Sequence, residues 1–199
     1  TPVVTLVGKS WELHVIDVLR TTRDENLAMI GESTAYVKSF DKEVVFDAEH
    51  FFDGYKADRD YALATLRAAA ANGADILVVC DTNGGAMPWE VEAAVRDVAA
   101  QFDTPLGIHT HEDAGCAATN TLVAVRAGAV QVQGTINGYG ERVANANLCT
   151  IIPDLQLKMG VSCVPHENLA RHTELSRDVA ELANLAHHAQ FPNVGGSAI

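Results

Sequence analysis

The sequence predicts an α/β protein built on a parallel sheet. Short apolar runs rich in β-branched residues alternate with longer Ala- and Leu-rich stretches of helical period, and the alternation repeats five times along the 199 residues. The apolar runs are short enough to be buried strands. This pattern is typical of βα units, in which a helix returns the chain to the start of the next parallel strand.

The predicted elements follow one another in the order that βα units require. A helix is indicated over residues 60–71, where an apolar stripe is followed by Gly73 as a stop signal. A second helix begins at Pro88, a favoured first helical residue, and its apolar positions repeat with helical spacing up to Phe102. The predicted strands are Val3–Val7, Glu43–Phe46, Ile76–Cys80, Leu106–Ile108 and Val130–Val132.

The C-terminal part of the chain is predicted to be helical. After Val161 an apolar pattern indicates one long last helix, and residues 191–196 follow as a loop. The residues that define this helix are Leu169, Leu175, Val179, Leu182 and Leu185.

Two architectures fit five βα units: a doubly wound open sheet, or part of an eight-stranded barrel. A complete barrel usually needs about 250 residues, so a barrel of this length would be incomplete. The nucleotide-binding patterns GxGxxG and GxxxxGK[ST] are absent from the sequence, which argues against a doubly wound nucleotide-binding fold.

Charge and composition limit the partners. Fourteen Lys and Arg residues stand against 26 Asp and Glu residues, a net charge of −12, so the field of the chain repels nucleic acid and anionic membranes. No apolar run reaches the roughly 18 to 20 residues of a membrane helix, and the first residues carry no signal pattern; we expect a cytoplasmic location. The sequence has four cysteines and no CxxC motif, and we expect these cysteines to be reduced.

Polar residues follow every predicted strand. In parallel α/β folds, functional groups collect at the carboxyl ends of the strands, so these side chains are expected to converge on one mouth. Carboxylates, imidazoles and amides together are what a metal-assisted site for a small polar substrate requires. The segments are Gly8–Ser10, Asp47–His50, Asp81–Asn83, His109–Asp113 and Asn137–Asn145.

His109 and His111 are candidate metal ligands. In an extended segment, residues two apart point to the same face, so both imidazoles can reach one ion. Hydrogen-bonded rim histidines would show the same spacing, and both interpretations stay open at this point. Two imidazoles with oxygen ligands suit zinc, manganese or magnesium to different degrees.

Four further residues are candidates for chemistry. Glu49 lies between an apolar strand and Phe51, at the expected edge of an apolar pocket suited to proton transfer, although a solvated carboxylate fits equally well. Glu141 and Asn145 share a face if a helix begins there. The Asn145 amide oxygen could complete a metal site and Arg142 could hold a carboxylate, whereas polar surface residues at a helix start would have the same pattern.

Five segments together closely resemble the citramalate synthase family and cover nearly the whole chain in the expected order. This family is grouped with the 2-isopropylmalate and homocitrate synthases, metal-dependent barrels of the HMG-CoA lyase type that condense acetyl-coenzyme A with a 2-oxo acid. The segments are Asp47–Lys56, Cys80–Gly85, His109–His111, Gln133–Arg142 and Asn145–Pro153.

The resemblance implies a fold and a domain division. The fold would be a partial (β/α)8 TIM barrel of about the last five βα units plus a C-terminal helix. Residues 1–160 would form the partial catalytic domain. Residues 161–199 would be a helical extension leading toward a linker subdomain.

The resemblance also implies residue roles. His109 and His111 look like the two imidazole metal ligands, and Asn145 like the amide at the metal. Glu49 resembles the acid/base carboxylate near the reacting carbonyl, and Glu141 the acid that supports the metal site. Thr82 looks like the hydroxyl that holds the carboxylate of the 2-oxo acid.

The implied reaction joins acetyl-coenzyme A to pyruvate at a divalent metal ion (Zn, Mn or Mg), with hydrolysis of the thioester. A homodimeric complete protein and a place in the biosynthesis of isoleucine, a branched-chain amino acid, are implied as well. Homocitrate or 2-isopropylmalate synthesis, or a related lyase reaction, is the neighbouring alternative. A non-catalytic barrel fragment that acts as an assembly partner is the alternative from another class.

The sequence departs from the family pattern in three ways. The family's first strand, which carries an Asp-Arg pair, is not present here, so the chain alone is expected to bind metal weakly and to be inactive. Five strands cut from a closed barrel are also expected to expose two strand edges. Glu112 stands where Asn or Asp usually follows the second histidine, and a longer acid there could disturb the metal site. Ala144 replaces a Gly, and a positive φ at this position would cost about 1 kcal/mol or more.

Overall fold

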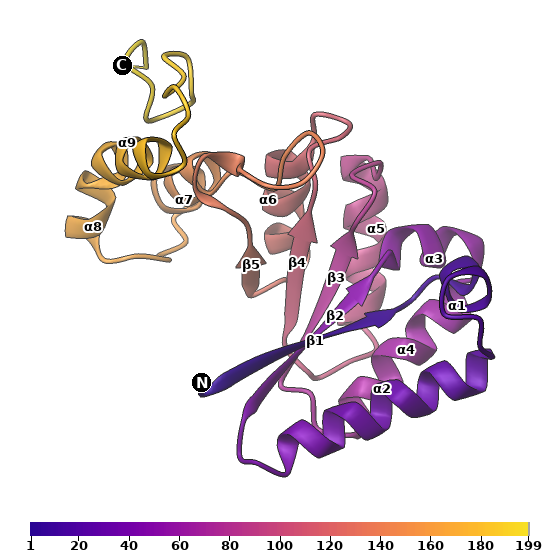
Figure 1. Ribbon diagram of the computed structural model, residues 1–199. Coiled ribbons are helices and arrows are strands. Elements are labelled where there is room, and N and C mark those ends of the chain that lie inside the picture. Colours follow the sequence, from indigo (N-terminus) through magenta and orange to yellow (C-terminus); the bar gives the residue numbers. More distant parts are fainter. Residues whose placement is uncertain (199) are drawn as a thin grey trace.

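The computed structural model describes residues 1–198 and contains a five-stranded, all-parallel sheet (Figure 1). The strands lie side by side in chain order, β1 to β5. A doubly wound sheet reverses its strand order at a switch point, whereas a barrel adds strands in sequence, so this order excludes the first alternative and confirms the barrel segment. The strands are β1 (Val3–Lys9), β2 (Glu43–Glu49), β3 (Ile76–Asp81), β4 (Leu106–Thr110) and β5 (Gln131–Gln133).

Six helices connect the strands, and a second group follows β5 at the far edge of the sheet (Figure 1). The first group is α1 (Glu12–Asp17), α2 (Arg23–Lys38), α3 (Phe51–Ala57), α4 (Arg59–Ala71), α5 (Pro88–Ala99) and α6 (Ala117–Ala127). The second group is η1 (Ile136–Gly138), α7 (Leu148–Pro153), η2 (Asp154–Lys158), α8 (His166–Ala170) and α9 (His172–Leu182).

Local signals fix the ends of the two helices that the sequence predicts best. At the start of α4 the Asp58 carboxylate accepts a hydrogen bond from the Tyr61 amide at 3.1 Å. After its end Gly73 has φ +97°, a conformation that suits glycine. Helix α5 begins at Pro88, and the Glu90 carboxylate accepts from the Met87 amide at 2.8 Å. Both predicted helices are confirmed.

The main core lies between the sheet and the connecting helices. Alternate residues of the three central strands, such as Phe46, Leu77 and Ile108, are buried against apolar helix residues such as Leu63 and Leu66. Leu6 of β1 and Val132 of β5 are partly buried against the same core. The opposite, concave face carries a small apolar cluster made of Val45, Val78 and Cys80. Polar side chains therefore occupy much of the concave face.

All five strands end later than predicted, and most of the added residues are polar. Lys9, Asp47, Glu49 and His109 lie within strands rather than after them. Apolar runs mark a strand that is buried on both faces, whereas these strands alternate between an apolar helix side and a polar concave side. Strand residues therefore contribute to the polar concave face, in addition to the loops that follow the strands.

The prediction of one long last helix is wrong. The segment forms two helices, α8 and α9, and α9 ends at Leu182, before Leu185. The face of α9 that is buried carries His172, Ser176 and Ala180, while Leu182 is 87% exposed. Helix α9 packs on η1, where Ser176 Oγ donates to Asn137 Oδ1 at 2.5 Å, so a polar contact and not an apolar stripe holds it.

Helix α2 has no predicted counterpart, because its buried residues include Asn26, Gly31 and Thr34 and form no apolar stripe.

Within residues 1–198 the four cysteines form no disulfide, as expected. In the same range no helix is both long and apolar enough to cross a membrane. The division at residue 160 stays a prediction.

The core assignment predicts unequal effects of one substitution at two helix positions. Leu66→Ala on α4 removes a fully buried side chain and should lower the free energy of unfolding by about 2–5 kcal/mol. Leu182→Ala on α9 removes a side chain that is 87% exposed and should change it by less than about 0.5 kcal/mol. Urea denaturation of the two variants measures the difference. Equal losses would contradict the assignment.

Candidate metal centre at the carboxyl ends of the strands

One row of polar side chains crosses the concave face near the carboxyl ends of the strands. The register places Lys9 opposite Glu49, Cys80 opposite His109, and His109 opposite Gln133. Paired residues in adjacent strands point to the same side of a sheet. A cavity of about 220 Å³ lies over this row and is lined by Val7, Asp47, Glu49, Cys80, Thr82, His109, His111 and Glu141.

The two imidazoles meet in this cavity, as their spacing predicts. Nε2 of His109 lies 3.0 Å from Nε2 of His111. His109 belongs to β4, and His111 directly follows the strand and forms a bridge with Asn145. His111 is 6% exposed, so its ring is held within the protein.

The hydrogen-bond partners of His111 determine which ring nitrogen carries its hydrogen. Nδ1 lies 2.8 Å from the carbonyl oxygen of Thr82, which can only accept. Nη2 of Arg142 is also 2.7 Å from this Nδ1, but its two hydrogens have acceptors in the Thr82 carbonyl and the Asp113 carboxylate. Nδ1 of His111 therefore donates to Thr82, and its Nε2 keeps a lone pair.

His109 has a matching arrangement. Its Nδ1 lies 2.8 Å from the side-chain oxygen of Gln133, so Nδ1 is the donor and Nε2 again has the lone pair. Two lone pairs 3.0 Å apart repel each other unless a proton or a cation lies between them. Two imidazole nitrogens bound at about 2.0–2.1 Å to one ion are separated by about 2.9 Å at an octahedral angle and by about 3.3 Å at a tetrahedral angle. The pair thus fits two ligands of a metal ion.

The described residues bring two of the three predicted metal ligands together. Across residues 1–198 no group of three or more His, Cys, Asp and Glu side chains is arranged to hold an ion. Asn145, the third predicted ligand, lies beside His111 through a backbone bridge, and its backbone N–H donates to the carbonyl oxygen of Gly138 at 2.9 Å. Its side chain packs against Gly140, where an added Cβ would overlap it, and Asn145 does not line the cavity.

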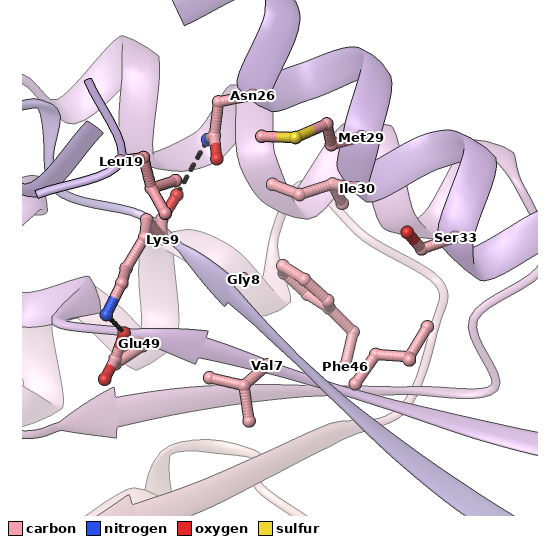
Figure 2. A pocket seen from close by; sticks show the side chains of 11 residues that line it. Val7, Gly8, Lys9, Leu19, Asn26, Met29, Ile30, Ser33, Phe46 and Glu49 are labelled. Atoms are coloured by element: carbon pink, nitrogen blue, oxygen red, sulfur yellow. Dashed lines mark hydrogen bonds and ion pairs between the residues drawn. The ribbon is translucent and has the colours of Figure 1, made fainter. Parts of the chain in front are cut away.

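Glu49 lies at the edge of a largely apolar pocket, as expected. Its carboxylate forms an ion pair with Nζ of Lys9, and Figure 2 shows the two side chains directed toward each other. The pocket, of about 420 Å³, includes Met29, Ile30 and Phe46 among its lining residues. Glu49 also lines the smaller cavity, so its carboxylate lies between the two spaces.

Thr82 links the ends of neighbouring strands. Its hydroxyl oxygen accepts a hydrogen bond from the His50 amide at 2.8 Å, while its carbonyl accepts from His111 and Arg142. His50 has φ +57°, a left-handed conformation that is unusual for a residue other than glycine. The Thr82 side chain lines the smaller cavity together with the imidazoles.

Arg142 ties together the loops after β3, β4 and β5. Nε and Nη2 donate to the two oxygens of Asp113, each at 2.9 Å, and Nη1 donates to Glu141 at 2.8 Å. With the bond to the Thr82 carbonyl, four of its five N–H groups have protein acceptors. The Glu141 side chain is 62% exposed, and its carboxylate lies 3.7 Å from Nδ1 of His111.

The two local departures from the family pattern have structural explanations. Glu112 does not contact the imidazoles, because its carboxylate accepts from the Ala117 amide at 2.8 Å at the start of α6. Ala144 is not among the residues with positive φ in the described chain, so the strain expected there is absent. Both expectations of a disturbed site are wrong.

Sequence reasoning missed three residues of this site. Asp47, Cys80 and Gln133 line the cavity or contact His109, yet the sequence pattern assigns none of them a role of its own. Cys80 ends an apolar run, and Asp47 and Gln133 are only the first residues of longer segments. The signal that could have found them is the alternation of side chains along each strand, carried past the apolar run.

Parallel strands in barrel order with polar groups at their carboxyl ends define a TIM-barrel type of α/β protein. Residues 2–179 match the family model described as HMGL-like, and the chain belongs to this family. The HMG-CoA lyase of Bacillus subtilis has the same fold, with a TM-score of 0.80 and 19% identity over 94% of this chain and 65% of that one.

Sequence relatives confirm the resemblance to citramalate synthases. The (R)-citramalate synthase of Aquifex aeolicus is 55% identical over 100% of this chain, and that of Geobacter sulfurreducens is 53% identical over 98%. A homocitrate synthase of Methanopyrus kandleri is 36% identical over 92% of the chain. The chain spans 38%, 37% and 45% of the lengths of these three relatives.

The Arg142–Asp113 ion pair predicts a pH-dependent stability. Hydrogen bonds from Arg142 lower the pKa of Asp113, so the pair stabilises the fold above the ordinary Asp pKa of about 4 and this contribution is lost as the pH falls through the lowered value. The excess thermal stability of the wild type over Asp113→Asn should therefore be largest at pH 7 and shrink toward pH 3. A difference that stays constant with pH would refute the assignment.

Proposed function

We propose that the complete protein containing this chain condenses acetyl-coenzyme A with a 2-oxo acid, with pyruvate giving citramalate, followed by hydrolysis of the thioester. The observation that carries the proposal is the distance of 3.0 Å between Nε2 of His109 and Nε2 of His111, which lets both nitrogens reach one ion. Identity of 55% and 53% to two (R)-citramalate synthases supports the choice of reaction. A homocitrate synthase at 36% identity supports the same class of condensation with a bulkier 2-oxo acid as the alternative.

His109 and His111 are the proposed ligands of a divalent zinc, manganese or magnesium ion, and the Asn145 amide is the proposed third group. When bound, the ion would polarise the keto group of the 2-oxo acid as a Lewis acid. Glu141, close to the His111 ring, is proposed to support this site from the loop after β5. Remaining ligands would come from water, substrate or parts of the protein outside this chain.

Glu49 is the proposed acid/base group. Its carboxylate lies between the two cavities and on the same face as His109, a placement that suits moving a proton at the oxygen of the reacting carbonyl. Lys9 holds the carboxylate over the concave face through its ion pair. The positive charge of Lys9 also offsets part of the acidic field that two anionic substrates would meet.

Thr82 and Arg142 are the proposed groups for the substrate carboxylate. The Thr82 hydroxyl lines the cavity beside the imidazoles and can donate while its oxygen accepts from His50. Within the part of the chain that the structure describes, the fifth N–H of Arg142, on Nη1, has no acceptor. It could therefore donate to the substrate carboxylate. A cytoplasmic homodimer that serves isoleucine biosynthesis completes the proposal.

Release of coenzyme A from acetyl-coenzyme A and pyruvate tests the reaction directly, with the complete gene product and a thiol reagent. Glu49→Gln should lower kcat by about 10²- to 10⁴-fold. Glu43→Gln, at the exposed start of the same strand, is the matched control and should leave kcat unchanged. Chelation of the metal should abolish release, and the 199-residue chain alone should show none.

Three results would contradict parts of this proposal. Faster turnover of 2-oxoglutarate or 2-oxoisovalerate than of pyruvate would assign the protein to the homocitrate or 2-isopropylmalate reaction. Full activity of Glu49→Gln would remove Glu49 from the mechanism. Absence of thiol release with every 2-oxo acid would favour the non-catalytic assembly role.

A further inference from the structure

A hydrogen-bonded chain of three side chains crosses the concave face behind the imidazole pair. Nε2 of Gln133, on β5, lies 2.9 Å from a carboxylate oxygen of Asp47, on β2. The other end of the Gln133 amide lies 2.8 Å from Nδ1 of His109, on β4. β3 and β4 separate β2 from β5 in the sheet, so the contact spans the curvature of the sheet.

The order of donors and acceptors in this chain is fixed from one end. A carboxylate can only accept, so the NH2 group of Gln133 must face Asp47 and the amide oxygen must face His109. Since that oxygen also only accepts, Nδ1 of His109 must carry the hydrogen. The lone pair of the imidazole is then on Nε2, 3.0 Å from Nε2 of His111.

Asp47 is partly buried, and its carboxylate accepts the hydrogen bond from Gln133. Burial raises the pKa of Asp47, while the hydrogen bond from Gln133 lowers it. A negative charge behind a ligating imidazole also increases the basicity of that ligand, as in other carboxylate–histidine metal sites.

We propose that Asp47 and Gln133 are positioning residues that hold the hydrogen of His109 on Nδ1 and thereby direct its Nε2 lone pair to the metal. The proposal rests on the proposed function, which makes His109 a metal ligand. It adds a role for two residues that touch neither the metal nor the reacting atoms. Asp47 acts through Gln133, and Gln133 acts through His109.

Gln131 provides a matched control. It lies two residues before Gln133 on β5 and points to the same face of the sheet. Its side-chain oxygen is buried and has no hydrogen-bond partner among residues 1–198. Gln131→Leu therefore makes the same chemical change on the same strand, without breaking the chain to His109.

Two measurements on the complete gene product test the proposal. Nitrogen-15 NMR of histidine-labelled, metal-free protein reports which ring nitrogen of His109 carries the hydrogen, and competition with a chelating indicator gives the affinity for Zn²⁺. Gln133→Leu should lose the hydrogen preference for Nδ1 and bind Zn²⁺ about 10- to 100-fold more weakly. Gln131→Leu should match the wild type in both readouts.

A charge exchange adds a rescue test. Asp47→Asn alone frees the Gln133 amide to turn over, so the Nδ1 preference and the Zn²⁺ affinity should both fall. Combining Asp47→Asn with Gln133→Glu restores an acceptor at His109 and a donor at position 47 with no change in net charge. The double variant should regain most of the wild-type affinity, which a purely structural role would not produce.

The outcomes separate this proposal from the proposed function. If Gln133→Leu keeps the Nδ1 hydrogen and binds Zn²⁺ as tightly as the wild type, the positioning role is refuted. If the wild type binds no Zn²⁺ through His109 and His111, the proposed function fails. In that case the NMR readout on the metal-free variants still decides whether Asp47 and Gln133 set the hydrogen position.

Discussion

The lateral register of the parallel strands is the constraint on which this site depends. Glu49, Cys80 and His109 come from three strands and line one cavity because paired positions in neighbouring strands face the same side. Lys9 and Gln133 contact Glu49 and His109 from the flanking strands. A slip of one residue in any strand would turn its polar group into the apolar layer under the helices. The apolar packing of Phe46, Leu77, Ile108 and the residues around them therefore also fixes the polar site.

Within the cavity, hydrogen bonds take over the positioning that apolar packing provides on the other face. The Thr82 carbonyl determines the hydrogen position of His111, and Gln133 does so for His109. Arg142 joins the loops after three strands, and its Nη2 lies 2.7 Å from Nδ1 of His111. Hydrogen bonds of this kind hold the two Nε2 atoms close together before any ion binds.

The sequence predicted the features that depend on local pattern. The spacing of His109 and His111 placed both rings on one side, and the alternation of apolar runs with helical stretches gave the parallel sheet. The partners of these rings could not be predicted, because Gln133 and Asp47 are 86 residues apart and meet through the curvature of the sheet. The ion pair of Lys9 with Glu49 depends in the same way on strand register.

The errors have a common physical origin. Apolar residues after Val161 suggested one buried helical stripe, but helix α9 is held by the contact of Ser176 with Asn137, and Leu182 is exposed. Glu112 looked like a disturbance beside a metal ligand, but its carboxylate turns to the start of helix α6. In both cases a polar side-chain contact, with Asn137 in one and with the Ala117 amide in the other, determined the local structure, and residue type alone does not report such contacts.

The most direct test of the central claim is a crystal structure of the complete gene product grown with zinc or manganese, with anomalous difference density recorded at the absorption edge of the metal. We expect one anomalous peak, bound by Nε2 of His109 and Nε2 of His111, with the Nδ1 atoms still directed at Gln133 and Thr82. A peak bound through an Nδ1 atom, or no peak beside the two imidazoles at saturating metal, would contradict it.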